Sequence, residues 1–168
     1  IHRKASNIVR PAMTLSARPT VAADLPALVD LFNHTVRAGG TTAHEEEWDL
    51  PTFKTYYFDD PAMVHTVLNG DTPIGFQAVF EIPENGLSIG SFTDQRAPVR
   101  GAGAVLFAAT KQATTDAGYA FINAKIRADN VPGWAYYTKM GFVDHAIDKD
   151  VPLSDGTPMD RVTKRLTL

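Results

Sequence analysis

The chain has 168 residues and 44% hydrophobic side chains, which suits one soluble domain with a single core. Its net charge of −3 argues against a nucleic-acid-binding surface, and no apolar run approaches the ~18 residues that would span a bilayer. The absence of cysteine excludes disulfides, thiolate metal sites and a cysteine nucleophile, and it fits a reducing, cytoplasmic setting.

The segment before the first predicted strand carries no pattern of folded structure. Residues 1–12 are polar and basic, lack an apolar signal-peptide core, and precede Met13, the first plausible initiator. We therefore interpret residues 1–12 as a flexible leader or a non-native extension. Residues 13–168 are expected to form a single domain, because no internal repeat or linker divides them.

The N-terminal half predicts a strand, two helices and three more strands. Thr20 is expected to be the N-cap of the first helix, where apolar residues recur at helical spacing until Gly39-Gly40. Asn69-Gly70 signals a hairpin turn. The predicted elements are a strand at 15–19, helices at 21–37 and 51–58, and strands at 63–68, 74–82 and 87–92, with an acidic loop at 41–50.

The C-terminal half predicts alternating helices and strands. A helix rich in small residues ends at Gly118, and Pro132 suits the first turn of a shorter helix that stops at Gly141. The predicted elements are helices at 102–117 and 132–140 and strands at 121–126, 142–147 and 160–167. The order is therefore β-α-α-β-β-β-α-β-α-β-β.

A glycine-bearing segment, residues 95–106, joins a predicted strand to a predicted helix. The unpaired N–H groups of a helix N-terminus attract phosphate, and Gly101 and Gly103 let the backbone approach an anion closely. Arg96 and Arg100 add positive charge nearby. Leu106 replaces the third glycine of a dinucleotide fingerprint and no Gly-Lys-Ser/Thr is present, so two rival phosphate motifs are excluded. The alternative is a glycine-rich turn without a ligand.

A second segment, residues 130–142, carries a more specific pattern: an Asn, a Tyr seven residues later, then Lys, an apolar residue and Gly-Phe. It resembles the motif of the GNAT N-acetyltransferase superfamily, and 27 positions separate Gly103 from Asn130, enough for one helix and one strand. The alternative is a short amphipathic helix with a packed tyrosine. The residues in register are Asn130, Tyr137, Lys139, Gly141 and Phe142.

The resemblance covers residues 15–166 and is closest to the phosphinothricin acetyltransferase-like branch. That branch has an Arg-Pro start, an Ala-Asp-Leu helix opening, an aromatic-Asn pair and a Thr-rich acidic loop. The corresponding residues are Arg18-Pro19, Ala23-Asp24-Leu25, Phe32-Asn33, Thr41-Thr42-Ala43-His44-Glu45 and Ile126-Arg127-Ala128-Asp129-Asn130.

This resemblance implies an α/β (α+β) GNAT fold: a mixed central sheet of about seven strands, helices on both faces, and a splay between strands 4 and 5. Backbone groups of Phe92 and Thr93 would bind the pantetheine arm of acetyl-CoA and polarise its thioester carbonyl. The residues implied in binding acetyl-CoA are Phe92, Thr93, Arg96, Val99, Arg100, Gly101, Ala102, Gly103, Ala104, Asn130 and Tyr137.

The phosphate loop departs from the family pattern in two places. Pro98 stands where an Arg or Gln usually opens the loop, and it has no N–H to offer a phosphate. Gln95 stands where many members have proline. Arg100 or Arg96 is expected to compensate. Pro98 also motivates the alternative that the chain is a non-catalytic CoA-binding or regulatory module.

The resemblance also implies direct acetyl transfer to a primary amine of a small, amino-acid-like molecule. Tyr137 would protonate the departing thiolate as general acid; the alternative is a packed tyrosine beside Tyr136. The general base is left open between Glu81, on the strand before a turn, and Glu45, Glu46 or Glu47 in the acidic loop.

The wall of the acceptor site is expected to include Phe32, Asn33, Thr42 and Glu45, because an acidic loop suits an amine. An amino-acid carboxylate would need a cation, for which Arg37 and Arg127 are candidates. Four of the five histidines, His34, His44, His65 and His145, are scattered and show no metal-ligand spacing, so no metal is expected. Family analogy suggests a homodimer.

Overall fold

A seven-stranded sheet organises residues 14–168, the part of the chain that the computed structural model describes. Residues 1–12 and Met13, interpreted above as leader and initiator, lie outside the described residues. The strand order is β1-β2-β3-β4-β5-β7-β6, and every pairing is antiparallel except β4 with β5. The strands are β1 (Leu15–Pro19), β2 (Met63–Asn69), β3 (Thr72–Ile82), β4 (Gly86–Thr93), β5 (Phe121–Arg127), β6 (Val143–Pro152) and β7 (Pro158–Thr167).

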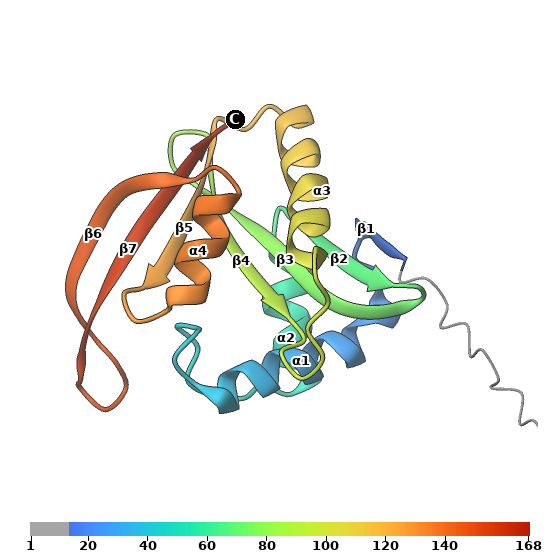
Figure 1. Cartoon of the computed structure of the whole chain (residues 1–168), viewed down its shortest axis with the longest axis horizontal. Coiled ribbons are helices and arrows are strands. Elements are labelled where there is room, and N and C mark those ends of the chain that lie inside the picture. Colours follow the sequence, from blue (N-terminus) through green and yellow to red (C-terminus); the bar gives the residue numbers. More distant parts are fainter. Residues whose placement is uncertain (1–13) are drawn as a thin grey trace, which may run out of the picture.

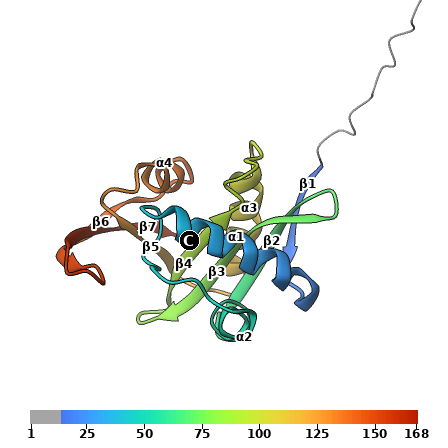
Figure 2. The same cartoon turned by 90° about the horizontal axis from the view of Figure 1, so that it is seen from below.

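Helices cover both faces of this sheet (Figures 1 and 2). On one face lie α1 (Leu25–Ala38) and α2 (Leu50–Lys54), the latter continued by a π turn, η2 (Thr55–Asp59). On the other lie α3 (Ala102–Asp116) and α4 (Val131–Lys139). The predicted order of elements and the mixed sheet with helices on both sides are therefore confirmed. No helix within residues 14–168 is long and apolar enough to cross a membrane.

The beginning of α1 differs from its prediction. Thr20 was expected to cap the helix, but its Oγ1 lies 2.7 Å from Thr66 Oγ1, and a 3-10 turn, η1 (Ala22–Asp24), comes first. The Asp24 carboxylate accepts the Val21 N–H at 3.0 Å and a bidentate pair of bonds from Arg18 at 2.7 and 2.9 Å. Asp24 therefore stabilises the turn, and α1 begins at the next residue, Leu25.

The hydrophobic core is divided by the sheet into two main clusters. The α1 face holds a dense group of aromatic rings, with Phe32, Phe53 and Phe76 fully buried. The opposite face packs α3 and α4 through residues such as Phe107 and Phe142. Ring pairs of this kind add to the burial of apolar area, so both layers hold β3 and β4 firmly in place.

The parallel pair β4–β5 stays together for only part of its length. Gly86, Leu87 and Ser88 are paired with β5, whereas Ile89–Thr93 have no partner on that side among the described residues. The two strands therefore diverge halfway along β4, which confirms the expected splay.

Candidate functional site

The opening between β4 and β5 exposes backbone groups of alternate residues. The Asn85 carbonyl accepts from Ala120 N–H beside β5, whereas Asp94 N–H donates to Ile74 O beside β3. Because backbone directions alternate along a strand, Ile89, Ser91 and Thr93 direct their N–H and C=O groups into the opening. Phe92, expected to bind through its backbone, instead directs those groups toward β3, and its ring packs in the α1-face core.

The N-terminus of α3 is left open for an anion. Its N-cap, Gly101, has the left-handed conformation (φ 88°) and offers no side chain to cap the helix. Among the described residues, Ala102 N–H bonds to Val99 O at 3.2 Å, but Gly103 and Ala104 N–H have no acceptor. The same holds for the N–H groups of Val99, Arg100 and Gly101. Free amides at a helix N-terminus form a phosphate site, so Pro98 removes only one potential donor.

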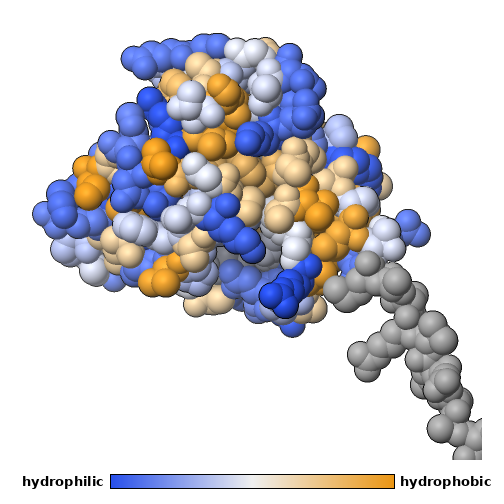
Figure 3. Space-filling view, turned by 45° about the horizontal axis from the view of Figure 1, so that its top comes forward, coloured by the Kyte–Doolittle hydropathy of each residue, from blue (hydrophilic) through white to orange (hydrophobic). Residues whose placement is uncertain are grey.

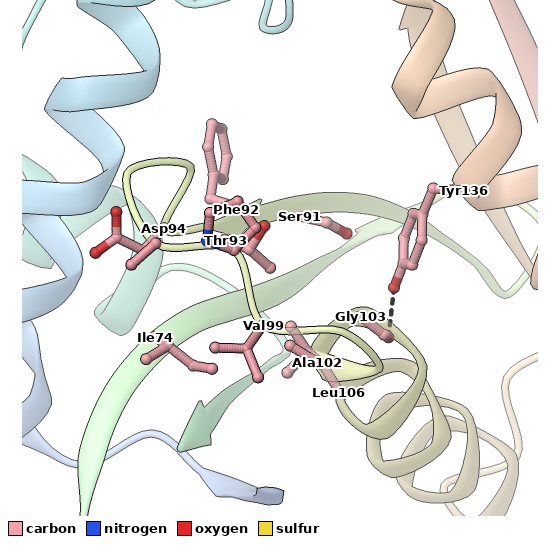
Figure 4. A pocket seen from close by; sticks show the side chains of 12 residues that line it. Ile74, Ser91, Phe92, Thr93, Asp94, Val99, Ala102, Gly103, Leu106 and Tyr136 are labelled. Carbon is pink, nitrogen blue, oxygen red and sulfur yellow. Dashed lines mark hydrogen bonds between the residues drawn. The ribbon is translucent and has the colours of Figure 1, made fainter. Parts of the chain in front are cut away.

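A cavity of about 270 Å³ lies between this helix start and the end of β4 (Figure 4). The floor of the cavity is apolar and consists of Ile74, Val99 and Leu106. Figure 3 shows one face of the whole molecule, where apolar surface gathers across the middle and hydrophilic residues lie along the edges of that face. Ser91, Thr93 and Tyr136 bring polar groups to its upper wall. The cavity therefore joins the open amides to the gap between the strands.

The two arginines of the loop have different surroundings. Arg96 donates to Asp94 at 2.9 Å and pairs with Asp30 at 2.8 Å, which ties the loop to α1 and raises the arginine pKa. Arg100 is exposed and forms no ion pair with a described residue. Of the two, Arg100 has its charge available for a phosphate.

A chain of hydrogen bonds crosses the opening from α3 to the buried tyrosine of α4. Tyr136 Oη donates to Gly103 O at 2.8 Å (Figure 4), and Gln77 Nε2 donates to Tyr136 Oη at 3.1 Å. Gln77 Nε2 also donates to Ser91 Oγ at 2.8 Å, and Ser91 Oγ lies 2.8 Å from Tyr137 Oη. Burial raises the pKa of Tyr136 to about 12 and that of Tyr137 further. Both phenols are therefore neutral at physiological pH, and Tyr137 retains a proton to donate.

Gly103 is required here by a ring contact as well as by the anion site. A Cβ on this residue would lie 2.7 Å from Tyr136 Cε2, closer than real contacts allow. At Gly101, by contrast, a Cβ would make only an ordinary contact with Leu15 Cδ1 at 3.7 Å, so the glycine is required by its positive φ.

A second cavity, of about 310 Å³, lies on the α1 face of the opening, and both Tyr136 and Tyr137 line it. One wall is aromatic, with His44, Tyr56, Tyr57 and Phe80. The opposite wall is cationic, with Lys125, Arg127 and Arg161 from β5 and β7. No Asp or Glu among the described residues lines it. We call this space the acceptor cavity.

The predicted acceptor residues divide into wall and support. Thr42 lines the acceptor cavity, and its carbonyl accepts from Arg127 Nη1 at 3.3 Å. Phe32 lies behind the wall, fully buried. Asn33 binds the backbone of Trp48 twice, at 2.8 and 2.9 Å, and so fixes the loop on α1.

The predicted bases lie outside both cavities. Glu81 is exposed near the β3–β4 turn, where Tyr119 Oη donates to it at 2.6 Å. Glu45 accepts from Ser154 N and Oγ at 2.9 and 2.8 Å, joining the acidic loop to the β6–β7 turn. Glu47 pairs with Arg37, a predicted carboxylate partner that is absent from the cavity lining. Each of these carboxylates therefore has a supporting contact away from the opening.

Asn130 acts within the fold as a helix cap. Its Oδ1 accepts the Gly133 N–H at 3.0 Å, and its Nδ2 donates to Thr41 O at 3.0 Å. The residue still lines the acceptor cavity, but both ends of its amide are engaged. The motif position is thus explained by the start of α4 and by its link to the loop.

Sequence reasoning missed three features of the site. Gln77 and Ser91 belong to no sequence motif. Their hydrogen bonds connect β3 and β4 to the tyrosines of α4, and contacts between distant parts of the chain leave no local sequence pattern. His44 was interpreted as a histidine that binds no metal and was given no site role, yet its Nε2 lies 2.7 Å from Tyr57 Oη. Arg161 sits on the last strand, far from either motif, although alternation along β7 could have placed it on the site face.

Comparisons with known proteins agree with this geometry. The model of the acetyltransferase (GNAT) family matches residues 26–142. A putative acetyltransferase, yncA, from Salmonella typhimurium, solved with acetyl-CoA, has a TM-score of 0.80 at 16% identity, over 92% of this chain and 94% of that one. A comparison with curated protein sequences gives no significant match.

Two further solved structures show the same fold at low identity. A phosphinothricin acetyltransferase from Sinorhizobium meliloti, in complex with acetyl-CoA, has a TM-score of 0.80 at 19% identity, over 93% of this chain and 89% of that one. A ribosomal-protein-alanine N-acetyltransferase from Brucella melitensis has a TM-score of 0.79 at 21% identity, over 90% and 99%. With a family match that spans more than half of its length, this chain belongs to the GNAT family of acetyltransferases.

Proposed function

We propose that this protein transfers the acetyl group of acetyl-CoA to the primary amine of a small, amino-acid-like molecule. One observation carries the proposal: a helix start with free amides and a cavity for an acceptor lie on either side of one opening, Ser91 lines both cavities, and its hydroxyl lies 2.8 Å from Tyr137 Oη in the acceptor cavity. Related structures from Salmonella typhimurium and Sinorhizobium meliloti hold acetyl-CoA in the same fold.

The diphosphate of acetyl-CoA fits the free amides at the start of α3, with Arg100 supplying charge. The pantetheine arm follows the edge of β4, where the backbone groups of Ser91 and Thr93 point into the opening. An N–H there also meets the thioester carbonyl oxygen and stabilises the negative charge that develops on it. The residues proposed to bind acetyl-CoA are Ser91, Thr93, Val99, Arg100, Gly101, Ala102, Gly103 and Ala104.

Tyr137 is proposed as the general acid. Its pKa is raised by burial, so the phenol is protonated throughout the physiological range. Ser91 Oγ accepts a hydrogen bond from Gln77, so the Ser91 hydroxyl can donate its own proton to Tyr137 Oη. The Tyr137 hydroxyl is then free to donate its proton to the leaving sulfur. Positioned proton transfer of this kind contributes about 10²–10⁴-fold in rate.

The cationic wall supports an acceptor that carries a carboxylate. Arg127 is already held by Asp129 at 2.9 and 3.0 Å and by Thr42 O. The Nε atom of Arg161 is buried and has no hydrogen-bond partner among the described residues. A buried donor without a partner is costly, and a carboxylate in the acceptor cavity would satisfy it. This chemistry agrees with the phosphinothricin acetyltransferase-like branch.

Assembly and location are proposed by family analogy and by the edge of the sheet. The last strand, β6, is an edge strand with exposed apolar side chains at Val143 and Ile147. An exposed apolar edge is a common pairing surface, so we propose a homodimer, active in the cytoplasm where acetyl-CoA is supplied. Light scattering on the purified chain would give the mass of the assembly.

The decisive experiment measures thiol release from acetyl-CoA with the twenty L-amino acids, their amides, and a set of polyamines and aminoglycosides. We expect turnover with a small group of amino acids. Acetyl-CoA binding by calorimetry without turnover on any amine would favour a non-catalytic CoA-binding module instead. Turnover only with peptides or polyamines would keep the enzyme and reject the amino-acid class.

A further inference from the structure

One hydrogen-bonded pair of side chains in the acceptor cavity has no part in the mechanism proposed above. His44 Nε2 lies 2.7 Å from Tyr57 Oη, and both side chains line the cavity wall. His44 belongs to the loop between α1 and α2, and Tyr57 to η2. Their contact therefore fixes the loop against the helical layer and directs two polar groups into the same space.

The Tyr57 hydroxyl reaches the place where the two substrates must meet. It lies 3.6 Å from the position that a Cβ would take on Gly90, so it contacts β4 where that strand has lost its β5 partner. The neighbouring residues Ile89 and Ser91 direct backbone groups into the opening. Tyr57 and Tyr137 both line the acceptor cavity, so the two hydroxyl-bearing side chains border the same space.

The surroundings keep His44 in its neutral form. Its ring contacts Phe32, Trp48, Tyr56, Tyr57 and Phe92 at centroid distances of 4.8 to 6.3 Å, and burial lowers the pKa of His44. The titratable groups that face it are Tyr56 and Tyr57, with Lys125, Arg127 and Arg161 on the opposite wall. Its neighbour in sequence, Glu45, is bound to Ser154.

Elimination leaves a single base in the cavity. No described carboxylate lines it, tyrosine and lysine side chains ordinarily lose a proton only at about pH 10, and burial raises the pKa of Tyr57 and Tyr137 above that value. A neutral imidazole is the remaining side chain that can take a proton near pH 7. We propose that His44 is the general base of the acetyl transfer, with the Tyr57 hydroxyl relaying the proton from the acceptor ammonium. This inference rests on the proposed function.

The proton and bond balance of the step is complete. The ammonium gives one proton to Tyr57 Oη as the tyrosine gives its own to His44 Nε2, and the free amine attacks the thioester carbonyl carbon. The C–N bond forms, the C–S bond breaks with its electron pair on sulfur, and Tyr137 protonates that sulfur. The new amide nitrogen loses its second proton, which restores Tyr137 through Ser91 or solvent, and His44 releases its proton to solvent.

The test compares the pH dependence of kcat/KM in the wild type, His44→Gln and Tyr57→Phe, using acetyl-CoA and the fastest amino acid of the panel. In the wild type, kcat/KM is expected to level off above an apparent pKa below the ordinary histidine value of about 6.5. In His44→Gln, kcat/KM should fall at least about 100-fold at pH 7 and keep rising with pH up to the pKa of the amine itself. Tyr57→Phe should lose roughly tenfold.

Chemical rescue separates a base from a structural contact. His44→Ala should regain activity with imidazole but not with pyrazole, which has the same shape and little basicity. His65→Gln removes another buried histidine outside the cavity lining and should leave the pH profile unchanged. Calorimetry with acetyl-CoA and a thermal melt verify that each variant is folded.

Three outcomes decide between the possibilities. Loss of the low-pH plateau together with imidazole-specific rescue supports the assignment. A His44→Gln enzyme with wild-type rate and pH profile, or equal rescue by pyrazole, overturns the base while the acetyltransferase function stands. Absence of transfer by the wild type to any amine overturns the proposed function and this inference with it.

Discussion

The Tyr137 hydroxyl lies 2.8 Å from Ser91 Oγ, and this contact joins the proposed general acid to the start of α3. The connection continues through Gln77 and Tyr136 to the carbonyl of Gly103. Since Gly103 also belongs to the open helix start, the helix that would hold the diphosphate is coupled to the phenol that would meet the sulfur. Substitutions along this chain test each connection.

Replacing the phenol should abolish rapid turnover without loss of acetyl-CoA binding. Tyr137→Phe removes only the hydroxyl and its bond to Ser91, so kcat is expected to fall by about 10²–10⁴-fold. The calorimetric Kd for acetyl-CoA should stay within about twofold, because the phosphate site is unchanged. Tyr119→Phe, which loses the bond to Glu81 at the far end of the sheet, serves as the control and should keep full activity. Undiminished kcat in Tyr137→Phe would refute the assignment.

Removing the serine hydroxyl should act only through the tyrosine. Ser91→Ala is expected to lower kcat about three- to tenfold, the effect of one lost hydrogen bond on the orientation of the phenol. In the double variant with Tyr137→Phe, Ser91→Ala should cause no additional loss, because its partner hydroxyl is gone. Additive losses in steady-state kinetics would show that Ser91 acts on the substrate directly.

A methyl group on Gly103 should disturb Tyr136. The added Cβ would meet Tyr136 Cε2 at 2.7 Å, so Gly103→Ala is expected to lower the free energy of unfolding by about 1–3 kcal/mol. Acetyl-CoA affinity should fall as well, because the ring and the helix start move apart. Urea denaturation and calorimetry measure both effects. Adding Tyr136→Ala should relieve most of the strain, and failure to do so would locate the clash elsewhere.

Neutralising Arg161 should affect only acceptors with a carboxylate. Arg161→Gln is expected to raise KM for the preferred amino acid about 10- to 100-fold, with far less effect on its amide. Arg37→Gln, which breaks the pair with Glu47 outside the cavity, is the matched control. Equal effects of Arg161→Gln on acid and amide would contradict carboxylate recognition.

Protonation of Asp24 should destabilise the beginning of α1. The hydrogen bonds from Arg18 hold the Asp24 pKa below its ordinary value, so the carboxylate stabilises the fold above the unfolded pKa of about 4. That contribution disappears as pH falls through the lower, folded-state pKa. Asp24→Asn should therefore cost about 1–3 kcal/mol at pH 7 and much less near pH 2. Urea titrations at both pH values measure the free energy of unfolding. Asp71→Asn, at an exposed turn residue, is the control and should change it little at either pH.

Local patterns predicted most of the fold, because each depends on neighbours in the sequence. Glycines at 39, 118 and 141 end their elements as expected, and Asn69-Gly70 forms the predicted hairpin. Thr20 failed as a cap because its hydroxyl bonds to Thr66, a partner 46 residues away. Long-range partners of this kind have no local signal.

The site was predicted less completely for the same reason. The motifs indicated Tyr137 and the start of α3, and the ligand roles of Asn130 and Asn33 stay predictions, since both side chains also make capping or loop contacts. Asn33 binds the backbone of Trp48 and Asn130 that of Thr41, 15 and 89 residues away, whereas the cap that Asn130 provides to Gly133 is local. Glu81 and Glu45 suited a base by residue type, yet the sheet and the β6–β7 turn hold them outside the opening.

The loop before α2 is fastened at several points. Asn33 holds Trp48 at one end, Asn130 and Arg127 hold Thr41 and Thr42 at the other, and Glu45 fastens the middle to Ser154. The chemistry of this segment can therefore diverge between relatives while the acetyl-delivering half of the enzyme is preserved. Natural or engineered changes in acceptor preference should accumulate at Thr42 and Ala43, which line the acceptor cavity, with His44 and the donor half inherited unchanged.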